Sequence, residues 1–284
     1  QQAHWLAQLC EGTLTATLAF NGGSSRWDAE SITATWRHVG DGYVLDGDYR
    51  YVIDGHTADL LIVAARAEGT TGVEGVSLFL LPADTSGVSR QWLPTMDQAR
   101  KQAAVQLKSV SLTTDALMGE PGQGWTPLSK VIDLAAIALA AEQVGGCQQL
   151  LDMTVAYTSE RVQFNRTIAS YQAVKHKAAD MMLKVEVARS AIYYAACVAQ
   201  EALEGGPLSA ELSEAASVAK SYCSDAYFAV AGDALQLFGG VGFTWEYDVH
   251  LYLKRAKSSE HLLGNGVFHR ERLARMLLDE GEES

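Results

Sequence analysis

The chain has 284 residues, and its 48% hydrophobic and 20% charged residues are typical of a globular protein with room for two domains. Its net charge of −12 argues against a surface for nucleic acid, which needs concentrated basic residues, so we expect no nucleic-acid partner. The four cysteines form no C-x-x-C pair, and the seven histidines show no metal-ligand spacing. We therefore expect neither disulfides nor a metal site, and a reducing, cytoplasmic location.

The first part of the chain has the short-period pattern of β-strands. Thr13–Phe20 alternates polar with apolar residues, and Ile32, Ala34 and Trp36 fall on one face of a second segment. Gly40-Asp41-Gly42 is typical of a hairpin turn. We predict an antiparallel β-barrel or sandwich in a domain of residues 1–120. The expected strands are 13–20, 31–37, 43–47, 59–65, 76–81 and 103–112.

The second part changes to the 3.6-residue period of helices. We predict Thr126 as an N-cap with Pro127 at the first helical position, and Gly239-Gly240 as a left-handed C-cap. Long helices joined by short loops favour a four-helix-type bundle in residues 121–284, and hence an α+β fold class overall. No apolar run reaches the roughly 18 residues of a membrane span, so we expect no membrane partner. The expected helices are 126–159, 171–203, 209–239, 248–257 and 267–279.

Three segments at helix junctions carry the most specific signals. Residues 161–166 (RVQFNR) close the first long helix, residues 171–176 (YQAVKH) open the second, and residues 236–243 (QLFGGVGF) close the third. Each has an ordinary structural explanation: arginine at a helix end favours the helix dipole, and Gly-Gly ends helices. Their order and spacing are more informative than any one of them.

Together these segments resemble the acyl-CoA dehydrogenase family, which carries R-x-x-F-G, a glutamine in a Q-A-x context and Q-x-F-G-G-x-G-F in this order. Arg255-Ala256-Lys257 extends the resemblance toward the last helix. The resemblance implies FAD as cofactor and acyl-CoA as substrate, with electron-transfer flavoprotein as the electron acceptor. It also implies that the family's N-terminal helical domain would precede Gln1. The residues that would serve a neighbouring subunit's FAD are Arg161, Phe164, Gln172, Gln236, Gly239 and Gly240.

The sequence departs from the family where the flavin ring and the catalytic base belong. The ring-contacting loop T-E-P-x-A-G-S-D corresponds to residues 19–25 (AFNGGSS), and the strand W-I-T-N-G to residues 51–55 (YVIDG). Ile53 therefore lacks the hydroxyl that the family places at the flavin edge. The two positions that carry the family's catalytic glutamate are Leu263 and Ile137, and neither side chain can abstract a proton.

Four carboxylates are candidates for a relocated base, of which Glu142 and Glu246 are the main ones. Asp133 lies one helical turn before Ile137, and Glu260 lies shortly before Leu263. Each is equally well explained as a salt-bridged or surface carboxylate. No catalytic residue is assigned from the sequence.

These losses fit a subunit that keeps the motifs it donates while its partner performs the chemistry. Residues 96–101 (MDQARK) and 242–248 (GFTWEYD) are similar to those of actinobacterial heteromeric acyl-CoA dehydrogenases, which act on bulky esters including steroid side chains. The resemblance thus implies the non-catalytic partner in a heterotetramer with a related subunit. Two alternatives stay open: a self-sufficient homotetramer with a relocated glutamate, and a non-enzymatic assembly protein on the same fold.

Overall fold

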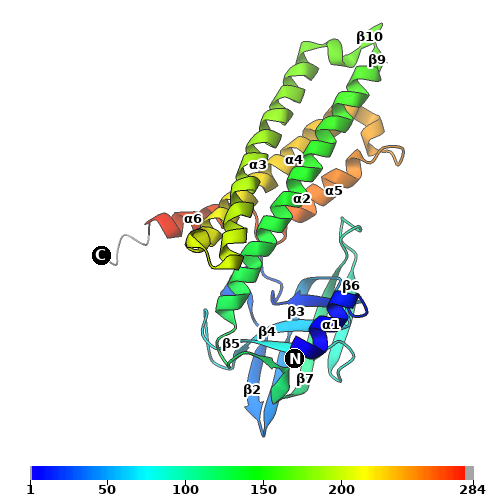
Figure 1. Ribbon diagram of the computed structural model, residues 1–284. Coiled ribbons are helices and arrows are strands. Elements are labelled where there is room, and N and C mark those ends of the chain that lie inside the picture. Colours follow the sequence, from blue (N-terminus) through cyan, green and yellow to red (C-terminus); the bar gives the residue numbers. More distant parts are fainter. Residues whose placement is uncertain (1, 279–284) are drawn as a thin grey trace. The chain divides into compact units, whose positions relative to one another are not determined.

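The computed structural model describes residues 2–278, with side chains from residue 5 onward, as two compact units. Unit 1 comprises Gln1–Ser129 and contains a β-sheet, whereas unit 2 comprises Lys130–Ser284 and is helical (Figure 1). The expected α+β fold class is confirmed.

From residue 2 onward, unit 1 contains a single sheet and one α-helix, α1 (Gln2–Glu11), which the sequence did not predict. The six expected strands are present, with β3 extending well beyond its predicted end. An exposed edge strand, β6, was missed, because its Val-Ser-Arg-Gln-Trp-Leu sequence has little apolar periodicity. The strands are β1 (Ala16–Ala19), β2 (Thr35–Val39), β3 (Gly42–Ile53), β4 (Leu60–Ala67), β5 (Val76–Pro82), β6 (Val88–Leu93), β7 (Gln102–Thr113) and β8 (Leu117–Met118).

The sheet is mixed and open rather than an antiparallel barrel, which corrects the sequence-based prediction. The strand order is β6-β7-β3-β2-β4-β5-β8, and β1 also pairs with β4. Both β1 and β2 run parallel to β4, while the other described pairs are antiparallel. The expected hairpin is confirmed, because Val39 in β2 pairs with Gly42 in β3. Apolar side chains of the central strands form one core.

The second predicted strand begins later than expected, and a buried arginine explains the difference. Residues Ala29–Ser31 form a 3-10 turn, η1, and β2 starts only at Thr35. The Arg66 side chain donates to the Ala29 carbonyl at 2.6 Å and to the Ile32 carbonyl at 2.7 Å. These acceptors bond to a guanidinium instead of a neighbouring strand, so the chain cannot be extended there.

Up to residue 278, unit 2 contains five α-helices and three short 3-10 segments. All five expected helices are present, although residue 279 of the last prediction lies outside the described residues. The α-helices are α2 (Trp125–Glu160), α3 (Gln172–Glu204), α4 (Leu212–Phe238), α5 (Val249–His261) and α6 (Gly266–Leu278). The 3-10 segments are η3 (Ile168–Ser170), η4 (Pro207–Glu211) and η5 (Gly239–Phe243).

One helix end has a regular left-handed cap, and two other ends differ from the sequence-based prediction. Gly205 ends α3 in the left-handed conformation, with φ 76° and ψ 25°. Gly239 ends α4 with φ 64° but ψ −145°, so the predicted left-handed cap is wrong there. At the other end of the bundle, α2 begins at Trp125, which places Pro127 third in the helix. Proline is tolerated there because the first four N–H groups have no partner within the helix.

The segment after α2 is a β-hairpin, not the simple helix end that the sequence indicated. Strands β9 (Val162–Gln163) and β10 (Arg166–Thr167) pair antiparallel. Their two-residue turn places Phe164 and Asn165 at φ 54° and 63°, both in the left-handed region. Such a turn matches the twist of the strands, and asparagine tolerates it, but phenylalanine rarely does.

One segment, Pro207–Phe243, is long and apolar enough to pass a test for a membrane span, with mean hydropathy 1.2. Core helices pass the same test. Its main part, α4, packs on both apolar clusters of unit 2 and carries a fully buried lysine, Lys220. We therefore interpret α4 as the central core helix of the bundle, with α3, α5 and α6 against it.

Candidate functional site

A groove of about 410 Å³ lies at one end of unit 2, where two of the motif segments meet. Arg161 comes from the end of α2, and Gly239 and Gly240 come from the turn after α4. The other residues of the groove are Tyr157, Gln163, Ile168, Leu237, Phe238, Val241 and Thr244. The fold thus joins segments that are almost 80 residues apart in the sequence.

Stacked aromatic rings line and support this groove. Tyr157 on α2 stacks on Phe238 at the end of α4, with ring centroids 4.1 Å apart and planes 11° from parallel. Tyr247 meets both rings edge-on, at 5.7 Å and 5.4 Å. This packing fixes the end of α2 against the end of α4 and so holds Arg161 near the Gly239 turn.

The Arg161 side chain is exposed, while its backbone is firmly held. Its N–H donates to the Tyr157 carbonyl at 2.9 Å, and its carbonyl accepts from the Ile168 N–H at 2.8 Å. Its guanidinium makes no hydrogen bond or ion pair with any residue that the structure describes. A cation with five donors therefore faces the groove without a partner among the described residues.

The backbone conformation favours glycine at position 239 but not at position 240. Gly239 has a positive φ of 64°, which by itself favours glycine. Gly240 has no positive φ, and a Cβ atom added there would meet nothing within 4 Å. No contact inside the chain therefore demands glycine at 240.

The remaining motif residues lie around the groove rather than in it. Phe164, at the tip of the β9–β10 hairpin, is 88% exposed. The neighbouring Arg166 guanidinium stacks on the Tyr171 ring at 3.8 Å. Gln172 is exposed at the start of α3, with its amide 3.4 Å from His176. Gln236 is exposed in the last turn of α4, and its carbonyl accepts the Gly239 N–H.

A second cavity, of about 500 Å³, lies within unit 1 beside the loop that corresponds to the family's flavin loop. It is lined by Gly22, Gly23, Arg50, Tyr51, Leu93, Pro94 and Thr95. Tyr51 stands at an irregularity in the pairing of β3 with β7 and has φ 62°. Such bulges re-aim side chains, and here a strained tyrosine lines the cavity.

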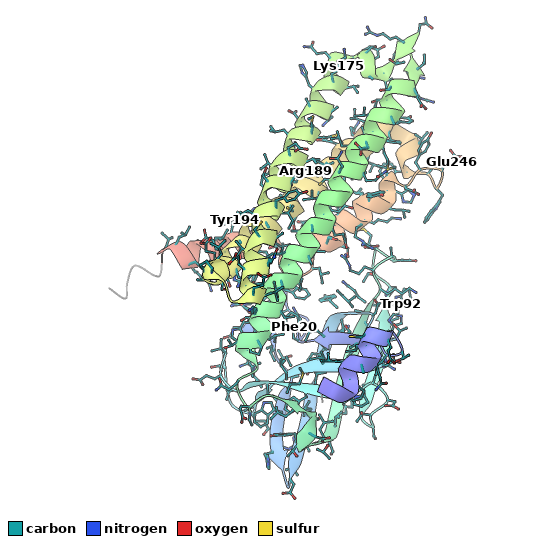
Figure 2. The ribbon with its side chains drawn as sticks, in the orientation of Figure 1. Phe20, Trp92, Lys175, Arg189, Tyr194 and Glu246 are labelled. Atoms are coloured by element: carbon teal, nitrogen blue, oxygen red, sulfur yellow. The ribbon has the colours of Figure 1, made fainter. Side chains whose placement is uncertain are left out.

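The loop of residues 20–26 bonds mainly to itself and to its own unit. The buried Asn21 side chain accepts from the Gly23 N–H at 2.7 Å and donates to the Arg26 carbonyl at 2.7 Å. The Gly22 N–H donates to the Ser31 carbonyl at 2.8 Å, and the Arg26 N–H donates to the Ser24 hydroxyl at 2.9 Å. Phe20, labelled in Figure 2, is buried edge-on against Trp27.

Neither position of the family's catalytic glutamate carries a base. Ile137 is buried in the apolar core of the bundle. Leu263, after α5, has φ 59°, and its carbonyl accepts from the His269 ring at 2.9 Å. The buried Lys220 ammonium donates to the carbonyls of Ser259, Glu260 and Gly264, at 2.8 to 3.2 Å. The loop is therefore fixed by polar groups that belong to the core.

The four candidate carboxylates lie apart from one another. Asp133 is buried, bonded to Arg272 at 2.9 Å and to the Ser213 hydroxyl at 2.7 Å. Glu142 forms an ion pair with Arg255 at 3.2 Å, and Glu260 forms one with Lys257 at 2.9 Å. Glu246 is exposed on the loop before α5, outside the bundle (Figure 2). Among the described residues, no group of three or more His, Cys, Asp or Glu could hold a metal ion.

Sequence reasoning missed several residues of both cavities. Tyr157 could have been found, because it lies one helical turn before Arg161 and on the same face. Val241 and Thr244 directly follow the Gly-Gly pair. Arg50 and residues 93–95 carry no signal in the sequence, because only the pairing of β3, β7 and β6 brings them beside the loop.

Comparison with known proteins identifies relatives of the chain. The family model "Acyl-CoA dehydrogenase, C-terminal domain" matches residues 122–278. Acyl-CoA dehydrogenase IpdE2 of Mycolicibacterium smegmatis is 36% identical over 214 residues, which are 75% of this chain and 57% of that protein. IpdE2 of Mycobacterium tuberculosis is 35% identical, over 89% of this chain and 67% of its own length.

A solved structure shows the same fold. Butyryl-CoA dehydrogenase of Megasphaera elsdenii has a TM-score of 0.88 and 27% identity, covering 97% of this chain and 71% of that one. The chain thus spans little more than half to about seven tenths of the proteins it matches. It belongs to the acyl-CoA dehydrogenase family, whose cofactor is FAD.

Proposed function

We propose that this chain is a subunit of a heteromeric, FAD-dependent acyl-CoA dehydrogenase that completes the FAD site of a related subunit. In this assembly the partner supplies the flavin-ring site and the base. This chain supplies Arg161, Phe164, Gln172, Gln236, Gly239 and Gly240. The reaction is the α,β-dehydrogenation of an acyl-CoA, with a bulky or steroid side-chain ester as the proposed substrate and electron-transfer flavoprotein as the acceptor.

The unpaired guanidinium of Arg161 beside the Gly239–Gly240 turn carries this proposal. A guanidinium fork matches two phosphate oxygens, and glycine lets a ligand approach the backbone closely. The Arg161 guanidinium has no partner among the residues that the structure describes, and no contact with them requires Gly240 to lack a side chain. These residues therefore fit the pyrophosphate part of FAD. Bound there, the cofactor would supply the hydride acceptor, and Arg161 would hold its negative charge.

The loop of residues 20–26 in unit 1 fits a flavin ring poorly, which supports the proposal that the partner subunit binds the ring. The N–H groups of Gly22, Gly23 and Arg26 all donate to acceptors within the unit. They are thus occupied and unavailable to flavin oxygens. Ile53 also brings no hydroxyl to the place where the family has threonine.

The candidate carboxylates give little support to a base in this chain. Asp133, Glu142 and Glu260 are each neutralised by a cationic neighbour. Glu246 is exposed to solvent, whereas a carboxylate that removes an α-proton gains basicity from a desolvated site. The alternative of a self-sufficient homotetramer thus rests on Glu246 alone.

The test compares the chain alone with the chain co-expressed with each acyl-CoA dehydrogenase chain of its source genome. We expect the isolated chain to bind little FAD and to show negligible acyl-CoA oxidation. With its partner it should form a flavin-containing complex that is active. Flavin absorbance per protein, native mass spectrometry and acyl-CoA oxidation are the measurements. A yellow, active homo-oligomer of this chain would contradict the proposal and favour the relocated base. A chain without flavin in every combination would favour the assembly protein.

A further inference from the structure

The cavity of unit 1 is lined by two consecutive side chains of one strand. In a regular β-strand, neighbouring residues point to opposite faces of the sheet. Arg50 and Tyr51 of β3 nevertheless both line the cavity of about 500 Å³. Between the core residues Tyr49 and Val52, β3 has one more residue than β7, with which it pairs (Figure 1). This β-bulge turns both side chains toward the cavity.

The bulge places a bulky residue in an unfavourable backbone conformation. Tyr51 has φ 62°, in the left-handed region that tyrosine rarely adopts. Its side chain is 42% exposed and makes no hydrogen bond or ring contact with the residues that the structure describes. The strain is therefore not explained by a partner of this side chain within the fold. Backbone strain of this kind clusters at ligand-binding sites.

The stem of Arg50 is held in place, while its charged end is unpaired. The Arg50 N–H donates to the Asn21 carbonyl at 2.9 Å. The stem lies on Gly23, where an added Cβ atom would be only 2.9 Å from the Arg50 Cγ. The guanidinium makes no hydrogen bond, ion pair or ring contact with any described residue. Five donors and a permanent positive charge are thus available to a ligand in the cavity.

Other donors of the cavity wall are already used, which restricts the kind of anion. The N–H groups of Gly22 and Gly23 donate to acceptors within the unit. Thr95 donates its N–H and its hydroxyl to backbone carbonyls of its own turn, at 2.8 Å and 3.0 Å. Phosphate sites commonly use several backbone N–H groups, whereas one guanidinium fork matches the two oxygens of a carboxylate. The wall therefore favours a carboxylate.

The rest of the wall indicates an apolar body for the ligand. Among the described residues that line the cavity, Arg50 alone is charged, and Tyr51, Leu93 and Pro94 contribute an aromatic ring and aliphatic groups. The volume is in the range of small-molecule sites. We infer that this cavity binds an apolar carboxylate, with the carboxylate on Arg50 and the aliphatic or aromatic body against the other three residues. The site belongs to unit 1 alone, so the inference does not rest on the proposed function.

Isothermal titration calorimetry of the full chain tests the site with three apolar carboxylates of different shape: octanoate, 4-phenylbutyrate and cholate. Each is compared with its neutral amide, which has the same body without the charge. We expect at least one carboxylate to bind saturably at one site per chain. Its amide should bind roughly 10-fold more weakly or worse, because it loses a charge-assisted hydrogen bond. Inorganic phosphate and FAD should not compete with the bound carboxylate.

Substitution of Arg50 tests the role of its guanidinium. Arg50→Met keeps an unbranched stem on Gly23 and removes the charge, so the Kd of the carboxylate should rise roughly 10-fold or more. Lysine should restore only part of the affinity, because it has no fork. Arg37→Met is the matched control, since it removes a cation of the same sheet that pairs with Asp46 and Glu68. It should change the Kd less than about 2-fold, and circular dichroism melting checks that each variant folds.

Tyr51→Gly separates a ligand-binding role from a structural one. Glycine adopts positive φ without strain, so the melting temperature should not fall. The Kd of the carboxylate should nevertheless rise, because the ring that contacts its body is gone. A lowered melting temperature with unchanged affinity would show that the tyrosine serves the fold and would overturn its place in the site.

Four results would overturn the inference as a whole. The first is the absence of saturable binding by all three carboxylates. The second is equal affinity for the amides, and the third is equal affinity of Arg50→Met, since the guanidinium would then not hold the ligand. The fourth is competition by phosphate or FAD that Arg50→Met abolishes, because the cavity would then belong to a phosphate ligand or to the cofactor.

Discussion

Under the proposed function, the loop of residues 20–26 in unit 1 and the groove beside Arg161 in unit 2 correspond to two parts of the family's cofactor site. In the loop, Asn21 and Ser31 occupy the backbone donors of Gly22 and Gly23. In the groove, the Arg161 guanidinium has no partner among the described residues, and a Cβ atom at Gly240 would meet none of them within 4 Å. Polar groups satisfied internally stabilise the fold, whereas groups left unsatisfied at the surface are free to bind a ligand. Substitutions in the two regions should therefore affect different properties.

The loop after α5 resembles the loop of unit 1, because its polar contacts are also internal. Burial, followed by the charge of Lys220, lowers the pKa of His269 from 6.5 to about 4. Between these values the unfolded chain binds a proton that the folded chain does not, so stability falls as pH decreases from 6.5 to 4. We expect this histidine to account for a loss of up to about 3 kcal/mol.

Urea unfolding at pH 7 and pH 4.5 of the wild type and His269→Gln checks this prediction. The free energy of unfolding of the variant should depend less on pH over this range, since glutamine does not titrate. Equal pH dependence of the two proteins would show that His269 is protonated in the folded state or exposed to water. Asp133, Lys220 and Arg272 are the charged groups that influence this ring.

Asn21→Ala tests the satisfied loop of unit 1. It removes two close hydrogen bonds, one to the Gly23 N–H and one to the Arg26 carbonyl, and leaves both groups without that partner. We expect a loss of about 2 kcal/mol in the free energy of unfolding. Ser24→Ala, at an exposed position of the same loop, should cost less than about 1 kcal/mol. Chemical unfolding measures both, and unchanged stability of Asn21→Ala would show that water replaces the side chain.

Arg161→Ala should lower the FAD affinity of the heteromer and leave the stability of this chain unchanged. A charge-assisted hydrogen bond is worth about 1.5–3 kcal/mol, so FAD affinity of the heteromer should fall about 10- to 150-fold. Lysine should restore it only in part, because its ammonium is a point charge without a fork. Flavin absorbance per protein in the purified complex measures the occupancy. Full occupancy with a melting temperature lowered by the loss of a helix-end charge would instead assign Arg161 a structural role.

Gly240→Ala distinguishes a ligand-facing glycine from a structural one. The added Cβ meets nothing within 4 Å, so stability should be unchanged or higher by less than about 1 kcal/mol. Flavin occupancy of the heteromer should nevertheless fall, because the methyl group stands where the cofactor approaches the turn. Thermal melting and flavin absorbance on one preparation give both values. A destabilised variant with full flavin would contradict the comparison between the two regions.

Leu263→Glu should have the smallest effect, an absence of acyl-CoA oxidation by the chain alone. The new carboxylate would follow α5, but the N–H groups of Gly22, Gly23 and Arg26 would still donate within unit 1 and not to a flavin ring. Catalytic groups tolerate only about 0.5 Å of misplacement, so a carboxylate without an ordered flavin is inactive. Turnover by this variant without a partner would show that unit 1 retains a flavin site.

The sequence by itself determined the α+β class, most helices and strands, and the motifs at the helix junctions. Periodicity suffices for these, because a helix or strand with one buried face repeats its apolar residues at its own period. The glycine at 239 likewise marked a helix end. Its position did not reveal its ψ of −145°, which depends on how the chain continues into η5.

Only the tertiary structure decided which polar groups are free. Arg66 bonds the carbonyls of residues 29 and 32 and so displaces a predicted strand. Asp133 and Glu142 were open candidates for a base until Arg272 and Arg255 were seen beside them, more than 100 residues away in the sequence. Likewise, only the structure showed that the Arg161 guanidinium has no partner among the described residues. Hydrogen bonds and ion pairs between distant residues have no period, so no pattern along the chain announces them.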